Sequence, residues 1–380
     1  MPCLQYIHNR YIRSGGMSRG RTFHCGASGR CVGLRHEVGN RHDMAYTVLP
    51  SLGHIKRLCG DHGIIQFAKG DVPDLTSGFC LDDNVRLLVL ALSIRDRDPE
   101  NAFALEAGYC VLDFIADASH EAPMYHNMMD AHGTFTDRFA SPESIGRLIR
   151  ALGLVLRDSD DENWRTVAAF ELRRAMSALP ALSSEHARAF AALGFAAAVE
   201  SGAVAYRAPL RAVAEAMNFE LERNSAEGWT WPLPEMTYDN GRLPEALMRA
   251  GSVLGDDELT ANGRRAMEFL AGIVQSGDVF EPIGAPGWYP RGGERPYYAA
   301  QPLEALAMID AWLAYGDSER AQVAYEWFLG RNREEFTVAD EASGGCHDGI
   351  DGPRSMNDSM GAESTLAYVQ AGLTMSDYAG

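Results

Sequence analysis

The sequence contains no run of 18 apolar residues, so no segment is expected to span a membrane. It also lacks an excess of positive charge: 34 Lys and Arg stand against 52 Asp and Glu, a formal net charge of −18. Nucleic acid and anionic membrane surfaces are therefore poor partners, because like charges repel. A neutral or weakly charged ligand fits this charge better.

Cysteine is scarce and scattered: the seven residues are odd in number and show no metal-type spacing. This pattern is typical of reduced thiols, and the N-terminus has no continuous apolar signal segment, so a cytoplasmic location is expected. The sequence has no HExxH motif and no Cys/His spacing of the metal-binding kind, so no metal is expected. Nucleophile-elbow, dinucleotide and phosphate-loop patterns are also missing, so no cofactor is expected.

Runs of alternating β-branched residues are missing as well, whereas helical spacing of apolar residues continues from about residue 45. The first 43 residues differ, with seven Arg, two acids and no periodicity. We therefore expect a disordered extension over residues 1–44 and one all-α domain over 45–376. The predicted helices are 47–58, 83–95, 100–117, 142–156, 162–178, 184–201, 206–222, 241–252, 257–275, 298–315, 318–330 and 360–374.

These helices are of two kinds. Segments 85–92 and 188–199 are apolar nearly all round, which predicts burial on most faces, whereas 162–178 and 257–275 have a charged face. The pattern favours two concentric rings of helices; an α-solenoid is the alternative, but no fixed repeat is visible. In a ring of helical hairpins every second connection emerges at the same end. Five long loops, 70–83, 119–142, 223–241, 277–298 and 331–360, are therefore expected to converge on one mouth.

The loop within RNSAEGWTWPLPEMTYDNGRLPE (223–245) is the richest of the five. Indole and phenol rings stack on apolar sugar faces, while carboxylates and amides bond to hydroxyls. Acid-catalysed sugar chemistry also needs one carboxyl kept protonated by apolar surroundings, and Glu235 beside Trp231 is the candidate. The other reading is that Glu235 and Asp239 are simply two solvated acids in a loop. Further binding candidates in this loop are Tyr238, Asp239 and Asn240.

Acids at the start of two predicted helices form a second group. Asp82 and Asp83 open the buried segment LDDNVRLLVLAL, and Glu363 opens the last helix. One acid at such a position is equally well explained as a cap or a partner of the helix dipole. Two acids exceed what a cap requires, so one is expected to face the mouth.

The remaining loops add aromatic, amide and imidazole groups. We expect Trp288 and Tyr289 to be stacking walls with Trp231, although a loop packed on its own aromatics is the other reading. Glycines in GGCHDG (344–349) allow a close backbone approach to a ligand. The polar candidates here are His126, Asn127, Gln301, His347 and Asp348.

On these residues the chain resembles the six-hairpin (α/α)6 toroid glycosidases, and more narrowly bacterial toroid domains found alone or fused to glycosyltransferases. The resemblance covers nearly everything from residue 45 onward. It implies a toroid fold, a saccharide substrate with a mannoside as one candidate, and a possible glycosyltransferase partner. The stretches that carry it are GFCLDDNVRLLVLAL (78–92), YHNMM (125–129), ESIGRLIRALG (143–153), WTWPLPEMTYDNGRLPEALM (229–248), GWYPRGG (287–293), AQPLEALAMIDAW (300–312), WFLGRN (327–332), GGCHDGI (344–350) and NDSMGAESTLAY (357–368).

The favoured hypothesis is an inverting glycoside hydrolase acting on a neutral oligosaccharide. Its two carboxyl groups would lie roughly 6.5–9.5 Å apart. Glu235 is the predicted acid and Asp83 the predicted base, with Glu363 or Asp348 as the competing base. His126, Asn127, Asp239, Asn240 and Gln301 would bind hydroxyls.

Two alternatives stay open. A sugar epimerase or lyase on the same fold would use a His or Tyr base, which makes His126, His347 and Tyr238 central. A lyase also needs basic residues in the cleft, and Arg291, Arg295 and Arg354 in the long loops are the candidates for that role. A non-catalytic glycan-binding domain that serves a glycosyltransferase is the other alternative.

Overall fold

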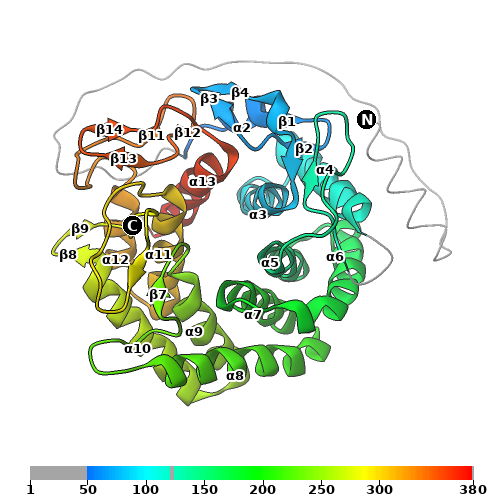
Figure 1. Ribbon diagram of the computed structural model, residues 1–380. Helices are drawn as coiled ribbons and strands as arrows, with labels where there is room; N and C mark the ends of the chain where they lie inside the picture. Colours follow the sequence, from blue (N-terminus) through cyan, green and yellow to red (C-terminus); the bar gives the residue numbers. More distant parts are fainter. Residues whose placement is uncertain (1–48, 120–123, 379–380) are drawn as a thin grey trace.

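The computed structural model describes residues 49–119 and 124–378; the predicted extension, residues 1–44, lies outside them. In this part of the chain, helices alternate along the sequence between an inner and an outer ring (Figure 1). The inner helices are α3 (Leu81–Arg97), α5 (Pro142–Asp158), α7 (Glu185–Glu200), α9 (Arg242–Leu254), α11 (Pro302–Tyr315) and α13 (Ala362–Ser376). The outer helices are α2 (Gly53–Leu58), α4 (Ala102–Ala118), α6 (Glu162–Ala175), α8 (Arg207–Asn224), α10 (Asp257–Val274) and α12 (Ser318–Glu326).

The inner ring is closed. Each inner helix packs on the next, and α13 returns to pack on α3. The predicted all-α (α/α)6 toroid is therefore confirmed. The inner helices are buried on most faces because they lie between the ring axis and the outer helices, as the apolar segments 85–92 and 188–199 predict.

Local signals in the sequence set the helix ends. The Ser141 side chain accepts a hydrogen bond from the Ser144 N–H at the start of α5, and Pro142 occupies the first turn. The Ser184 side chain caps α7 in the same way. At the C-terminal end of α11, Gly316 adopts a left-handed conformation, with φ of 94°, and ends the helix.

The contact between α5 and α7 depends on glycine. A Cβ atom on Gly153 would overlap the carbonyl oxygen of Gly194, and one on Gly194 would overlap that of Ile149. Only hydrogen side chains at both positions allow the two backbones to approach this closely. This pair of helices therefore forms the most tightly packed section of the inner ring.

All five predicted loops lead into N-terminal ends of inner helices, and short antiparallel ladders join them. β5 pairs with β6, β7 with β10, and Ala300 bridges Ile350. The strands are only two or three residues long, too short for a pattern of alternation to reveal them. They are β1 (Cys59–Gly60), β2 (Gly63–Ile64), β3 (Ala68–Lys69), β4 (Val72–Pro73), β5 (Phe79–Cys80), β6 (Met128–Met129), β7 (Glu235–Met236), β8 (Gln275–Ser276), β9 (Val279–Phe280), β10 (Tyr289–Pro290), β11 (Ala339–Asp340), β12 (Gly345–Cys346), β13 (Ile350–Gly352) and β14 (Ser355–Met356).

Several predicted helices are shorter than expected; segment 318–330 ends as α12 at Glu326, and segment 162–178 ends as α6 at Ala175. Segment 298–315 becomes helical only from Pro302, because Ala299 adopts a left-handed conformation, with φ of 51°, and Ala300 pairs with Ile350. Segment 47–58 is reduced to α2, Gly53–Leu58. Along the described segments, no helix combines the length and the apolar character needed to cross a bilayer.

Candidate functional site

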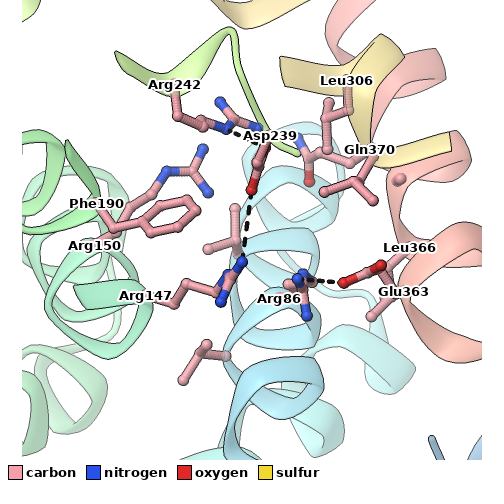
Figure 2. A pocket seen from close by; sticks show the side chains of 14 residues that line it. Arg86, Arg147, Arg150, Phe190, Asp239, Arg242, Leu306, Glu363, Leu366 and Gln370 are labelled. Atoms are coloured by element: carbon pink, nitrogen blue, oxygen red, sulfur yellow. Dashed lines mark hydrogen bonds and ion pairs between the residues drawn. The ribbon is translucent and has the colours of Figure 1, made fainter. Parts of the chain in front are cut away.

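The inner ring encloses a cavity of about 60 Å³, called the central cavity below. Every inner helix contributes to it, as does the loop before α9, and it lies beneath the long loops (Figure 2). Arginine is the most frequent polar residue in its wall. The lining consists of Val85, Arg86, Val89, Arg147, Arg150, Phe190, Asp239, Arg242, Leu303, Leu306, Glu363, Leu366, Ala367 and Gln370.

Arg86 of α3 holds two of the predicted catalytic carboxyl groups together. Its Nη1 donates to Asp83 Oδ1 at 3.0 Å, and its Nη2 donates to Glu363 Oε2 at 2.5 Å (Figure 2 shows the second contact). Asp83 Oδ1 and Glu363 Oε2 therefore lie within roughly 8 Å of each other, because one planar guanidinium group contacts both. Glu363 reaches the cavity, and 38% of its side chain is exposed.

Asp83 differs from Glu363 in its burial. Its carboxyl group also accepts a hydrogen bond from the Cys80 thiol at 3.2 Å, and only 9% of its side chain is exposed. Burial raises the pKa of Asp83 to about 6, against the opposing effect of Arg86. Near neutral pH this group is thus close to its own titration range.

Asp82 and the preceding loop serve mainly to position α3. Asp82 accepts hydrogen bonds from Ser144 Oγ at 3.0 Å and from Arg147 Nη1 at 3.4 Å. The Asn127 side chain accepts the Leu81 N–H at 3.1 Å, so Asn127 caps α3 from a neighbouring loop. His126 Nδ1 lies 2.7 Å from the carbonyl oxygen of Asp137.

Asp239 lies at the cavity wall in a left-handed conformation, with φ of 51°. Its N–H donates to the buried Glu304 carboxyl, and its side chain is 3.4 Å from Arg242 Nε. Burial and then Asp239 raise the pKa of Glu304 to about 8. Asn240 also donates to Glu304, at 3.3 Å, and its own Oδ1 is buried with no hydrogen-bond partner among the described residues.

The four arginines of the cavity are not equally paired. Arg86 has carboxylate contacts of 2.5 and 3.0 Å, and Arg242 has contacts of 2.7 Å to Glu245 and 2.6 Å to Asp310. The shortest carboxylate contacts are 3.4 Å for Arg147 and 3.6 Å for Arg150. These two are longer than a charge-assisted hydrogen bond of about 2.7–2.9 Å.

The aromatic candidates divide into two groups. Tyr238 is half-buried, stacks on His186 with ring centroids 4.8 Å apart, and lies 6.1 Å from the half-buried Trp288. Trp231 requires a correction: it is fully buried, so it belongs to the core and offers no face for stacking in this conformation. Tyr289 is half-buried against Trp229, with ring centroids 5.7 Å apart.

Glu235 is also placed differently from the prediction. It lies exposed in β7, opposite Pro290 of β10, and does not belong to the lining of the central cavity. The apolar pocket beside Trp231 that its predicted role requires is therefore not present. The β7–β10 ladder turns this side chain toward solvent while it directs Met236 into the core.

The last loops place three further candidates near α11 and α13. Asp348 Oδ1 accepts the Gly361 N–H at 2.8 Å, and burial raises the pKa of this carboxyl group. His347 Nδ1 lies 2.8 Å from the carbonyl oxygen of Asn357. Gln301 precedes α11, where its carbonyl oxygen accepts the Glu304 N–H at 3.2 Å. None of the three lines the central cavity.

The residues that sequence reasoning missed are charged side chains on inner helices, chiefly Arg86, Arg147, Arg150, Arg242 and Glu304. A signal was available in ESIGRLIRALG, where Arg147 and Arg150 stand three apart in an otherwise apolar helix. Charge on a helix that must be buried indicates a functional or paired group. These arginines lie in helices, so a prediction based on the loops alone does not include them.

A second and wider hollow of about 590 Å³ occupies the C-terminal halves of the inner helices, and we call it the C-terminal hollow. It shares Val89, Arg150 and Gln370 with the central cavity. Several of its charged residues pair at ordinary distances, such as Arg157 with Glu200 at 2.9 Å. No group of three or more His, Cys, Asp or Glu within residues 49–119 and 124–378 is placed to hold a metal ion.

Comparison with known proteins supports the fold. No family model matches the chain, and no curated protein matches it. Solved structures do. A sugar epimerase from a ruminal bacterium is 15% identical, with a TM-score of 0.65 over 86% of this chain and 94% of that chain. A cellobiose 2-epimerase from Bacillus thermoamylovorans is 10% identical, with a TM-score of 0.64 over 84% and 96%.

An alpha-1,6-mannanase from Salegentibacter is 9% identical, with a TM-score of 0.58 over 86% of this chain and 97% of that chain. The chain is thus an (α/α)6 toroid protein, and its resemblance to the six-hairpin toroid enzymes is confirmed at the level of the fold. The neighbours named here act on sugars, by epimerisation in two cases and as a mannanase in the third.

Proposed function

We propose that the protein is a glycoside hydrolase in which Asp83 and Glu363 form the catalytic carboxyl pair. The observation that carries this proposal is their shared guanidinium, Arg86, at the edge of the central cavity. Their separation of at most roughly 8 Å is compatible with the spacing of an inverting enzyme, in which water enters between the carboxyl groups. The sugar-acting toroid enzymes of the same fold support a saccharide as the ligand.

Asp83 takes the role of the acid and Glu363 that of the base. Burial favours the protonated form of Asp83, whose proton passes to the glycosidic oxygen as the bond to the anomeric carbon breaks. Glu363, which is the more exposed of the two, takes a proton from the water that attacks this carbon. Because Asp83 is largely covered, Arg86 must move away from it when the substrate binds.

The test is a screen of manno- and gluco-oligosaccharides with the product anomers resolved by NMR. We expect a single anomer of inverted configuration. Asp83→Asn and Glu363→Gln should each lose most of the turnover, while the control Asp377→Asn, at the far end of α13, should keep it. Full turnover in both active-site variants, or a product that retains configuration, would contradict the proposal.

The pH dependence gives a second test of Asp83. An acid with a pKa of about 6 in the free protein is increasingly deprotonated above that pH, so kcat/KM should fall about tenfold for each pH unit above 6. Asp83→Asn should abolish this alkaline limb in whatever activity remains. A limb that persists unchanged in the variant would assign it to another group.

Sugar epimerisation is the second candidate, and His186 with Tyr238 favours it. His186 Nε2 is buried without a hydrogen-bond partner among the described residues, and burial lowers the pKa of this imidazole. A neutral imidazole stacked on Tyr238 beside Arg147 has the properties of a general base. Incubation of reducing sugars in D₂O distinguishes the two candidates, because epimerisation through proton abstraction exchanges a carbon-bound hydrogen and hydrolysis does not.

A further inference from the structure

We infer that the substrate carries an anionic substituent, a carboxylate or a phosphate, that binds in the central cavity between Arg147 and Arg150. The inference refines the proposed function, because it assumes that a saccharide binds at this end of the ring. It replaces the neutral oligosaccharide expected from net charge. Acidic residues outnumber basic residues in the chain as a whole, whereas the lining of the cavity holds four arginines and two acids.

The first argument is the pairing of these arginines. Arg147 meets Asp82 at 3.4 Å and Asp239 at 3.7 Å, and Arg150 meets Asp310 at 3.6 Å. Asp310 lies much closer to Arg242, at 2.6 Å, so its charge is largely committed elsewhere. Both guanidinium groups therefore retain N–H donors that an incoming anion can use at shorter distances.

The second argument is burial. Arg147 is 9% exposed and its Nε has no hydrogen-bond partner among the described residues. An unmet donor of a buried cation is costly unless a ligand satisfies it. Phe190 fixes the direction of the group, since the Arg147 guanidinium carbon lies 4.5 Å from the centre of its ring. Figure 2 shows Arg147 and Arg150 beside Phe190, with their guanidinium groups directed into the cavity.

Repulsion between cations gives a third argument. Burial and then the nearby Arg242 lower the pKa of Arg150, which means that its positive charge is under-compensated. The groups that face Arg150 are Arg242, Glu245, Asp310 and Asp239. An anion placed between Arg147 and Arg150 would offset this repulsion and would leave the tighter pairs of Arg242 intact.

The size of the cavity decides which part of a substrate enters. A volume of about 60 Å³ holds roughly four water molecules, enough for a carboxylate or a phosphate. The sugar ring would lie above, toward Tyr238 and Trp288 at the loop end. Glycosidic cleavage at Asp83 and Glu363 would then occur beside the anchored ring.

Equilibrium binding of small probes tests the inference without turnover. D-glucuronate, D-glucose 6-phosphate, inorganic phosphate and D-glucose are titrated calorimetrically into native protein at low salt. We expect at least one anionic sugar to bind about tenfold or more tightly than glucose, with weakening as salt is added. Preference for glucuronate identifies a uronic acid as the source of the charge, and preference for glucose 6-phosphate identifies a sugar phosphate.

The variants are Arg147→Gln and Arg150→Gln, with Arg157→Gln in the C-terminal hollow as the matched control. Each of the first two variants should reduce affinity for the anionic sugar by about tenfold or more, whereas the Arg157→Gln control should keep the native affinity. If Arg147→Gln fails to fold, Arg150→Gln still decides the question, because among the described residues the ion pair that Arg150 would lose is the long 3.6 Å contact with Asp310. Arg150→Lys, which keeps the charge, should recover part of the affinity.

Equal binding of glucose and the anions, no binding of any probe, or native affinity in both variants would overturn the inference. These outcomes are separable from failure of the proposed hydrolysis. Anion binding that depends on Arg147 and Arg150, without cleavage of any glycoside, would reject hydrolysis alone. Cleavage of neutral oligosaccharides that is insensitive to Arg150→Gln would reject the anionic substrate alone.

Discussion

The two ends of the inner ring use charge differently. At the N-terminal end the central cavity holds buried arginines, of which Arg147 and Arg150 have carboxylate contacts no shorter than 3.4 and 3.6 Å. At the C-terminal end, Arg97 meets Asp377 at 2.5 Å and Arg157 meets Glu200 at 2.9 Å. These two exposed pairs have short contacts and stabilise the fold only slightly, whereas buried charges that lack close partners are expensive and mark a functional site.

The loops explain why the two ends differ. Long segments before inner helices place Asp239 at the cavity wall and tie β7 to β10 above it. The opposite end has mostly short connections, such as residues 98–101 between α3 and α4. Only the loop end can therefore cover a ligand while the helices beneath it stay fixed.

The largest expected effect comes from Glu363→Gln at the functional end. Loss of a catalytic base should lower kcat about 10²–10⁴-fold, with little change in the unfolding transition. Turnover on the cleaved glycan and thermal unfolding provide the measurements. Asp377→Asn on the same helix is the control, and equal losses in both variants would show that the two ends do not differ in function.

Gly153→Ala tests the packing that brings Arg147 and Phe190 together. The new methyl group would overlap the Gly194 carbonyl, so α5 and α7 must separate, at a cost of about 3 kcal/mol in the free energy of unfolding. Gly272→Ala in α10 is the matched control, because a Cβ there meets nothing within 4 Å. It should stabilise the protein by about 0.5–1 kcal/mol. Denaturant unfolding that shows similar effects for both would contradict the close contact.

Glu304→Gln tests how far the buried Glu304 carboxyl at the loop end makes the stability of the protein depend on pH. The pKa of Glu304 is raised from 4.5 to about 8, so the native state binds more protons than the unfolded state between these pH values. Stability therefore falls as pH rises from about 4.5 to 8. The variant cannot titrate and should remove at least about 2 kcal/mol of this decline. Urea unfolding at several pH values measures it, and an unchanged slope would show that other groups cause the decline.

Arg157→Gln at the C-terminal hollow should have the smallest effect. Its partners Asp158 and Glu200 are each 37% exposed, so the loss should stay below about 1 kcal/mol and shrink further with added salt. Chemical unfolding at low and high ionic strength provides the measurement. A larger loss that is insensitive to salt would make the two ends alike.

Most of the fold was predictable because its signals are local. Ser141, Ser184 and Gly316 mark helix ends by their own hydrogen bonds or conformations, which depend on residues within a few positions along the chain. The exceptions depend on distant pairing. Ala300 remains extended because Ile350, fifty residues later, bridges to it, and no local pattern records that contact.

The site was predictable only in part. Asp83 and Glu363 were identified as acids at helix starts, and the structure adds that Arg86 joins them. Trp231 and Glu235 were chosen for their chemistry, but the β7–β10 ladder and the core packing decide their exposure. A loop of this composition has several possible foldings, and its own sequence does not say which side chains face the cavity.

The sequence by itself determined the number, order and burial of the helices, because apolar periodicity and capping act over a few residues. Only the tertiary structure decided which charges meet. Arg86 and Glu363 are 277 residues apart, and Arg147 and Asp239 lie on different sections of the ring. Closure of the ring brings them within reach, and the strength of each pairing depends on distances of tenths of an ångström that only packing sets.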